Sequence, residues 1–257
     1  MKLSGKVAIV TGSSRGIGKA IAIALARAGA DVVVAERSEE AKKDLAGTIG
    51  ETAAAIRALG RRALAVRCDV GDEESVNQMV QRALQELGRV DVLVNNAAVG
   101  YFRPFMQIEP RHWDLVMRVN TKGPFLCCRA VLPQMIAQGG GSIVNISSNA
   151  AAGVYSQVKH EDGRPRVTGV LYGASKAALD RLSRGLAAEV AENNIAVNSL
   201  RPAAVTWSEG MLLLNRDVVA GSYVMPEVYM TKAAVFLAQQ DGRGITGQAF
   251  DDQTLCR

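Results

Sequence analysis

Residues 6–18, KVAIVTGSSRGIG, decide the fold of this chain. The apolar run KVAIVT is typical of a buried strand, and apolar side chains recur at helical spacing in the residues that follow. Gly12, Gly16 and Gly18 lie in the turn between them, in the pattern G-x-x-x-G-x-G. Such a turn lets a phosphate approach the backbone, and the helix N-terminus adds unpaired N–H groups and a positive dipole end. The segment predicts a pyrophosphate-binding loop, and the alternative is a loop whose glycines serve the turn only.

The rest of the chain alternates in the same way. Apolar runs predict strands and stripes at helical spacing predict helices, with one long helical region interrupted near Gly123 and Pro124. Continuous apolar strands between amphipathic helices indicate a parallel sheet covered on both faces, in a single domain over residues 1–257. Two segments break the rhythm: we expect residues 157–168 to be a surface insertion and residues 203–226 to be a mobile flap over the cleft. The predicted strands are residues 6–11, 31–35, 63–67, 90–94, 142–147, 195–200 and 248–250, and the predicted helices include residues 47–59, 76–87 and 172–192.

Composition excludes several classes of protein. The 257 residues are 48% hydrophobic and 21% charged, and the net charge of +5 comes from scattered basic residues, so we expect no nucleic-acid partner. The four cysteines form no C-x-x-C and the two histidines, His112 and His160, are far apart, which argues against a disulfide scaffold and a metal site. No signal peptide and no apolar span of ~18 residues is present, so we expect a cytoplasmic protein without a membrane segment.

An acid/base pair is predicted in YGASK, residues 172–176. Tyr172 and Lys176 are four residues apart on a predicted helix and share one face. Lowering a tyrosine pKa from ~10 to ~7 requires about 4 kcal/mol. One cation at ~4 Å supplies about that much at an effective dielectric of ~20. Ser148, after a neighbouring strand, would orient a substrate oxygen, and Asn120 would bind a water that links Lys176 to solvent.

A second pair, Tyr155 and Lys159, has the same spacing. The polar sequence HEDGRPR that follows it predicts no helix to hold that pair in register. We therefore assign the functional tyrosine to Tyr172.

The coenzyme's adenosine half would meet the end of the second strand. Glu36 lies about 20 residues after the glycines, where an acid binds the ribose hydroxyls of NAD and repels a 2′-phosphate. Arg15 and Arg37 instead suit the 2′-phosphate of NADP. Both coenzymes stay open, with NAD slightly favoured. Asp69 would bind the adenine amino group or serve as a turn residue, and the amides of Asn95 and Asn96 would line the coenzyme or hold the sheet edge.

Taken together, TGSSRGIG, NNAA, NISS and YGASK resemble the short-chain dehydrogenase/reductase family over nearly the full chain, with a weaker similarity to its hydroxysteroid-dehydrogenase-like branch. The resemblance implies an α/β Rossmann-type doubly wound parallel sheet, a small-molecule alcohol or carbonyl substrate, and a homodimer or homotetramer packed through the two long middle helices. It implies Tyr172 as acid/base, Lys176 on the nicotinamide ribose, Ser148 on the substrate and Asn120 in a water relay. The coenzyme-binding residues predicted from the motifs and the resemblance are Gly12, Ser14, Arg15, Gly16, Ile17, Gly18, Glu36, Arg37, Asp69, Val70, Asn96, Ala97, Tyr172, Lys176, Pro202 and Val205.

The chain departs from the family pattern at a few positions. Ala98 and Ala203 stand where the family usually has glycine, and Thr206 is one position closer to Pro202 than usual. The gap between Ser148 and Tyr172 is wider than usual, and the expected insertion accounts for the extra length. The function predicted is NAD(P)-dependent hydride transfer between a secondary alcohol and a ketone or aldehyde. The alternative is a dinucleotide sensor without turnover, which has no need of all four catalytic residues.

Overall fold

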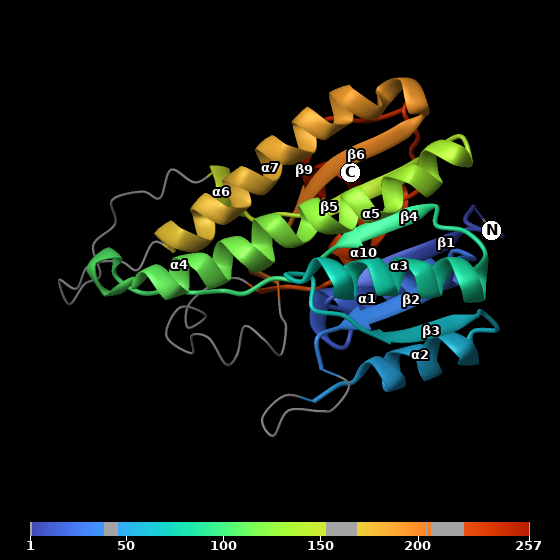
Figure 1. Ribbon diagram of the computed structural model, residues 1–257, viewed down its shortest axis with the longest axis horizontal. Helices are drawn as coiled ribbons and strands as arrows, with labels where there is room; N and C mark the ends of the chain where they lie inside the picture. The colour runs from blue at the N-terminus through green and yellow to red at the C-terminus, as the bar shows by residue number, and fades with distance from the viewer. Residues whose placement is uncertain (1, 39–45, 153–168, 204, 207–223, 257) are drawn as a thin grey trace.

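The fold is given by a computed structural model, which describes residues 2–38, 46–152, 169–203, 205–206 and 224–256. Within these residues seven strands form one parallel sheet in the order β3-β2-β1-β4-β5-β6-β9 (Figure 1). The order runs from β1 to β3 on one side and then reverses to β4, which confirms the predicted doubly wound Rossmann-type arrangement. The strands are β1 Val7–Thr11, β2 Asp31–Glu36, β3 Ala63–Arg67, β4 Val92–Asn95, β5 Gly141–Ile146, β6 Ile195–Arg201 and β9 Ala249–Asp251.

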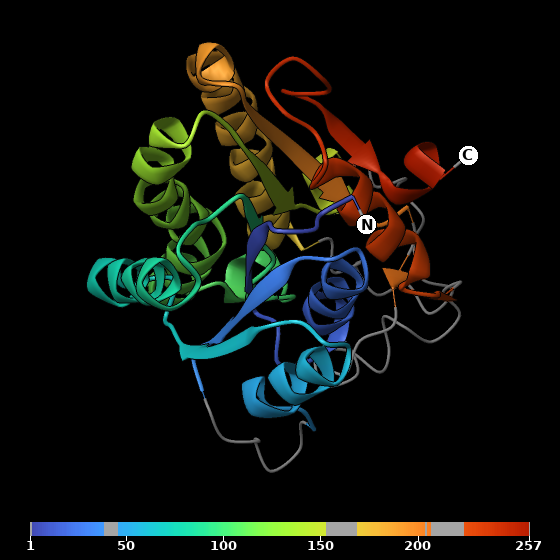
Figure 2. The ribbon, with the colours of Figure 1, turned by 90° about the vertical axis from the view of Figure 1, so that its right-hand side faces the viewer.

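Helices cover both faces of the sheet (Figure 2). Side chains along each strand alternate between the two faces of the sheet. Neighbouring residues such as Ile9 and Val10 therefore belong to separate hydrophobic cores, one on each face. Burial on both faces explains why the strands are continuous apolar runs. No helix among the described residues is both long and apolar enough to cross a membrane. One face carries α1 Gly16–Arg27, α2 Ile49–Ala58 and α10 Val228–Leu237, and the other carries α3 Glu73–Leu87, α5 Gly123–Ala137 and α7 Val170–Val190.

Local sequence signals set the ends of α2 and α3. Thr48 and Glu51 form a capping box, in which the Glu51 N–H donates to Thr48 Oγ1 at 3.1 Å and the Thr48 N–H donates to Glu51 Oε2 at 3.3 Å. Asp72 caps α3 by accepting from the Ser75 N–H at 2.7 Å. Gly88 ends α3 with a φ of 86°, a left-handed conformation that favours glycine.

The interruption predicted near Gly123 and Pro124 is present as a π-helical turn directly before Gly123. Helix α4, Pro110–Met117, continues through a π-helical turn at Arg118–Lys122 directly into α5. Pro124 is the second residue of α5 and has no N–H to donate to the π-helical turn before it. The irregularity therefore lies just before Gly123, in the turn that carries Asn120.

The two predicted irregular segments lie mostly outside the described residues. This applies to the insertion at 157–168, to Tyr155 and Lys159, and to most of the flap at 203–226. The described ends of the flap contain β7, Val205–Thr206, which pairs in parallel with β8, Val224–Met225. The flap prediction missed this strand pair.

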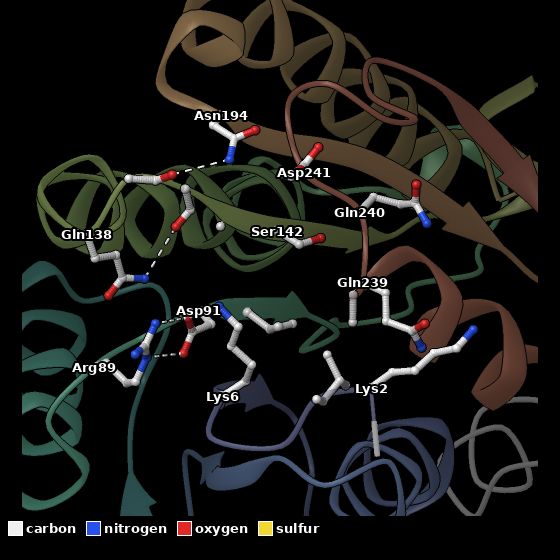
Figure 3. A pocket seen from close by; sticks show the side chains of 16 residues that line it. Lys2, Lys6, Arg89, Asp91, Gln138, Ser142, Asn194, Gln239, Gln240 and Asp241 are labelled. Carbon is white, nitrogen blue, oxygen red and sulfur yellow. Dashed lines mark hydrogen bonds and ion pairs between the residues drawn. The ribbon is translucent and has the colours of Figure 1, made fainter.

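At the amino edge of the sheet, the carboxyl group of Asp91 joins β1 to β4 (Figure 3). Its side chain is 5% exposed and accepts hydrogen bonds from Lys6 Nζ at 3.0 Å, from Arg89 Nη2 at 2.7 Å and from the Val7 N–H at 2.9 Å. Burial alone would raise the pKa of Asp91, but the bonds from Arg89, Val7 and Lys6 outweigh it and lower that pKa. The cavity of about 220 Å³ beside Asp91 lies at the edge opposite to the sequence motifs and is not the expected coenzyme site.

We predict that Asp91→Ala lowers the free energy of unfolding at pH 7 by about 2 kcal/mol, because the buried Val7 N–H loses its acceptor. The carboxylate has a lower pKa folded than unfolded, so its contribution is present above the unfolded pKa of ~3.9 and fades as the pH falls below that value. Urea unfolding between pH 7 and pH 3 measures this difference.

The matched control is Glu86→Ala, which removes an exposed pair with Arg82. Exposed pairs of this kind contribute about 0.5 kcal/mol or less. Equal losses in the two variants would contradict the role of Asp91.

Candidate active site

The glycine loop is held to the segment after β4 by one amide. Asn96 Nδ2 donates to the carbonyl oxygens of Thr11 at 2.9 Å and Gly12 at 2.8 Å. A Cβ atom on Gly18 would collide with the Gly12 carbonyl and with this amide, so glycine is required there. Gly12 and Gly16 have φ values of 65° and 54°. The loop and the open N-terminus of α1 form a cradle whose shape and N–H groups fit a dinucleotide pyrophosphate.

Thr11 also shapes this loop, although the sequence analysis did not single it out. Its Oγ1 accepts from the Asn96 N–H at 3.1 Å and from the Ala97 N–H at 3.2 Å. Asn95 holds the neighbouring strands, since its Nδ2 donates to Asn145 Oδ1 at 2.8 Å. Both Asn95 and Asn96 thus hold the sheet edge, and the other interpretation left open, a contact with the coenzyme, stays a prediction. The signal for Thr11 was its place immediately before the first glycine.

The residues predicted to choose the coenzyme meet at the end of β2. The buried Ser14 donates from Oγ to Glu36 Oε2 at 3.2 Å. Arg15 donates from Nε to Ser14 Oγ at 3.2 Å and from Nη2 to the Gly47 carbonyl at 3.2 Å. Arg37 is exposed, and its backbone N–H donates to Glu36 Oε1 at 3.0 Å. The Glu36 carboxylate is therefore held by the Ser14 hydroxyl and the Arg37 backbone N–H. Ile17 is half-buried in the first turn of α1.

Asp69 and Val70 follow β3 at the same edge. Asp69 Oδ1 accepts from the Gly71 N–H at 2.9 Å, which makes Asp69 a turn residue, while Asp72 is the cap of α3. The other interpretation of Asp69, a contact with the adenine amino group, stays a prediction. Val70 is 7% exposed and packs in the core.

Lys176 is the most heavily buried charged group of the site. It is 2% exposed, its Nζ donates to the Ile146 carbonyl at 2.7 Å, and that Nζ lies 5.7 Å from the centre of the Tyr172 ring. Burial lowers the pKa of Lys176 to about 8, and the Asp180 carboxylate partly opposes this effect. The predicted pair thus comes together on α7, beside the end of β5.

Asn120 reaches Tyr172 through Ser175, a residue inside YGASK that the sequence analysis missed. Asn120 Nδ2 donates to Ser175 Oγ at 3.0 Å, and Ser175 Oγ donates to the Tyr172 carbonyl at 2.7 Å. Asn120 also accepts from the Val99 N–H at 2.8 Å and donates to the Val99 carbonyl at 3.0 Å. The Asn120 side chain is therefore occupied on both sides by protein groups.

Ser148 lies between β5 and the short helix α6, Asn149–Ala152. Its Oγ accepts from the Ala150 N–H at 3.2 Å, and α6 packs against α7 (Figure 1). A Cβ on Gly173 would lie 2.8 Å from the Ala150 carbonyl, so the glycine beside Tyr172 allows this close approach. Phe102 covers the other side, with its ring centre 5.3 Å from that of Tyr172.

Pro202 and Val205 belong to the segment after β6. Pro202 is half-exposed directly after the strand, and Val205 begins β7. The side chain of Val205 lies outside the described residues, as do the predicted flap residues Trp207, Met211, Leu212 and Leu213.

Comparison with known proteins agrees with this geometry. A family model described as short chain dehydrogenase matches residues 6–211. The chain is 34% identical over 254 residues to D-threitol dehydrogenase from Mycolicibacterium smegmatis, covering 96% of this chain and 90% of that protein. The structure of 3-ketoacyl-(acyl-carrier-protein) reductase from Brucella melitensis complexed with NADH has a TM-score of 0.79 and 30% identity and covers 97% of each chain. A 7α-hydroxysteroid dehydrogenase complexed with NADH and 7-oxo glycochenodeoxycholic acid has a TM-score of 0.83 and 29% identity, covering 97% of this chain and 93% of that one.

We predict that Lys176→Met raises the free energy of unfolding of the coenzyme-free protein at pH 7. The lowered pKa, from 10.5 to about 8, corresponds to a penalty of at most about 3 kcal/mol, from which the lost bond to Ile146 must be subtracted. Below pH 8 the folded protein carries the desolvated ammonium. Between pH 8 and pH 10.5 the folded form loses this proton before the unfolded form does. The free energy of unfolding of wild type therefore rises relative to that of the variant.

Urea unfolding at pH 7 and pH 10 measures the difference in free energy of unfolding between variant and wild type. The control is Lys2→Met, at an exposed lysine. A variant that is less stable than wild type by the same amount at both pH values would contradict the penalty.

Proposed function

The chain belongs to the short chain dehydrogenase family and is an NAD(P)-dependent oxidoreductase, and from this premise we propose that it interconverts a secondary alcohol and a ketone or aldehyde with Tyr172 as acid/base. The observation that carries the proposal is the buried Lys176 ammonium beside the Tyr172 ring. A cation held there favours the phenolate over the phenol. A phenol that titrates near the working pH can both take and give a proton.

When bound, the nicotinamide coenzyme accepts or supplies a hydride. The chain's own residues handle the proton and the orientation. In alcohol oxidation, Tyr172 takes the proton from the substrate hydroxyl, while the Ser148 hydroxyl orients the substrate oxygen. The Asn120 side chain is held by Val99 and Ser175, so a water relay to Lys176 would use the Asn120 backbone. Lys176 would also hold the nicotinamide ribose.

The coenzyme we propose is NAD. Glu36 places a carboxylate at the end of β2, where a 2′-phosphate of NADP would have to lie. Arg15, which would neutralise such a phosphate, donates instead to Gly47 and Ser14. The loop residues Gly12, Gly16 and Gly18 would hold the pyrophosphate, Asp69 the adenine, and the segment from Pro202 to Val205 the carboxamide.

We also propose that the protein is a cytoplasmic homodimer or homotetramer packed through α5 and α7. Phe125 and Ile136 of α5 are each 45% exposed, which supports burial of this helix against a second copy. Cys68, Cys127, Cys128 and Cys256 are all free thiols, which suits a reducing compartment.

Tyr172→Phe is expected to lower kcat by about 100-fold or more, because the proton then has no positioned donor or acceptor. Binding of NADH should stay within about twofold of wild type. Turnover across a panel of alcohols and ketones and fluorescence titration with NADH measure the two effects.

Tyr155→Phe is the matched control and should keep full turnover. If Tyr155→Phe lost activity and Tyr172→Phe kept it, the site assignment would be wrong. Tight NADH binding by wild type with no turnover on any panel member would support the sensor alternative.

Coenzyme choice should change with Glu36. Wild type is expected to bind NADH more tightly than NADPH, and Glu36→Gln should improve NADPH binding by about tenfold, or about 1.4 kcal/mol, by removing charge repulsion. Fluorescence titration of both variants with both coenzymes measures this preference. Glu192→Gln is the control, because Glu192 is an exposed carboxylate in the turn before β6 and its replacement should leave the affinity for both coenzymes unchanged. A wild-type preference for NADPH would contradict the proposal for NAD.

A further inference from the structure

The peptide of Ala203 lies where the pairing of β6 with β9 ends. The register of this parallel pair ends at Arg201 and Asp251. The next residue of β6, Pro202, has no N–H to donate. Ala203 therefore presents the first backbone N–H beyond the sheet, at the first residue of the predicted flap.

Two side chains hold the backbone of Ala203, one at its N–H and the other at its carbonyl. Asp252 Oδ1 accepts from the Ala203 N–H at 2.8 Å, and Asn149 Nδ2 donates to the Ala203 carbonyl at 3.0 Å. Asp252 begins α11, Asp252–Cys256, and Asn149 begins α6. Among the described residues, no other side chain forms a hydrogen bond with the backbone of Ala203. The two bonds place Ala203 between the end of β9 and the residue that follows Ser148.

Burial of the Asp252 carboxylate lowers the stability of the folded protein unless its hydrogen bonds compensate. Its residue is 0% exposed, and its Oδ2 has no hydrogen-bond partner among the described residues. A buried carboxylate with one unpaired oxygen is expensive unless the bonds that it makes are needed. An apolar residue at this position would fill the space without that expense but would leave the Ala203 N–H without an acceptor.

We propose that Asn149 and Asp252 are positioning residues. They hold the carbonyl and the N–H of Ala203, an arrangement we call the clamp, and so fix the Pro202–Ala203 corner relative to Ser148. This inference rests on the proposed function, in which Pro202 borders the nicotinamide and Ser148 orients the substrate. The clamp keeps Pro202 at a fixed distance from Ser148. Its loss lets the corner move, which weakens coenzyme binding and misaligns the substrate oxygen.

The experiment compares Asn149→Ala, Asp252→Ala and Asp252→Asn with wild type. Each →Ala variant should raise the Kd for NADH by about fivefold to tenfold and lower kcat, because a misplaced reacting group slows the chemical step. Asp252→Asn should recover at least half of the lost affinity, since its amide oxygen still accepts from Ala203. Asn149 is exposed, so its replacement tests the clamp without disturbing the core.

Thr254→Ala is the matched control on α11. Thr254 Oγ1 donates to Asp251 Oδ2 at 2.8 Å and has no recorded bond to Ala203 among the described residues. It should keep wild-type Kd and kcat. Thermal unfolding of all variants separates a folding defect from a change at the site.

The clamp is overturned if Asn149→Ala keeps wild-type Kd and kcat, or if Asp252→Asn is as impaired as Asp252→Ala. These outcomes are distinct from a failure of the proposed function. If wild type binds neither NADH nor NADPH, the proposed function fails. If wild type turns over and depends on Tyr172 while Asn149→Ala is unchanged, the clamp alone fails.

Discussion

Hydrogen bonds between Thr11 and Asn96 join the end of β1 to the segment after β4, and the site depends on them. At this point the strand order reverses, and the loops leave the two neighbouring strands toward opposite faces of the sheet. The peptide groups there have no ladder partners, so side chains must satisfy them. The Thr11 hydroxyl accepts from two backbone N–H groups, and the Asn96 amide donates back to the Thr11 and Gly12 carbonyls. The shape of the glycine cradle is thereby fixed before any coenzyme arrives.

The same principle extends to the side chains of the proposed site, several of which are bonded to backbone groups. Lys176 donates to the Ile146 carbonyl, Ser175 donates to the Tyr172 carbonyl, and Asn120 is bonded to both backbone groups of Val99. A backbone partner cannot rotate away, so each group is oriented in advance of the reaction. Lys176 differs from the others because burial lowers its pKa, which means that its charge destabilises the folded protein at neutral pH. In the proposed function, stability and activity therefore oppose each other at this residue.

The sequence predicted the features that depend on local pattern. Apolar runs located the strands, and the spacing of Tyr172 and Lys176 placed both on α7 because four residues span about one helical turn. It did not predict Ser175 as the link to Asn120, nor Asp252 as the partner of Ala203, because both contacts depend on how distant elements pack. The interruption expected near Gly123 and Pro124 lies directly beside them, but its π-helical form was not predicted, because such a turn has no signature in the residue pattern.

The two alanines that replace glycine in the family pattern illustrate how a departure is accommodated. Within the described chain Asn194 is the only non-glycine residue with a positive φ, so Ala98 and Ala203 both adopt backbone conformations open to any residue. Glycine is therefore not required at either position for conformational reasons, in contrast to Gly12. At Ala203 the peptide is held instead by Asn149 and Asp252, which act where the β6 ladder ends and proline cannot donate. The carboxyl edge of the sheet is thus secured at β1 and at β6 by the same device, a side chain that takes over where strand pairing stops, and the proposed coenzyme and substrate positions lie between these two points.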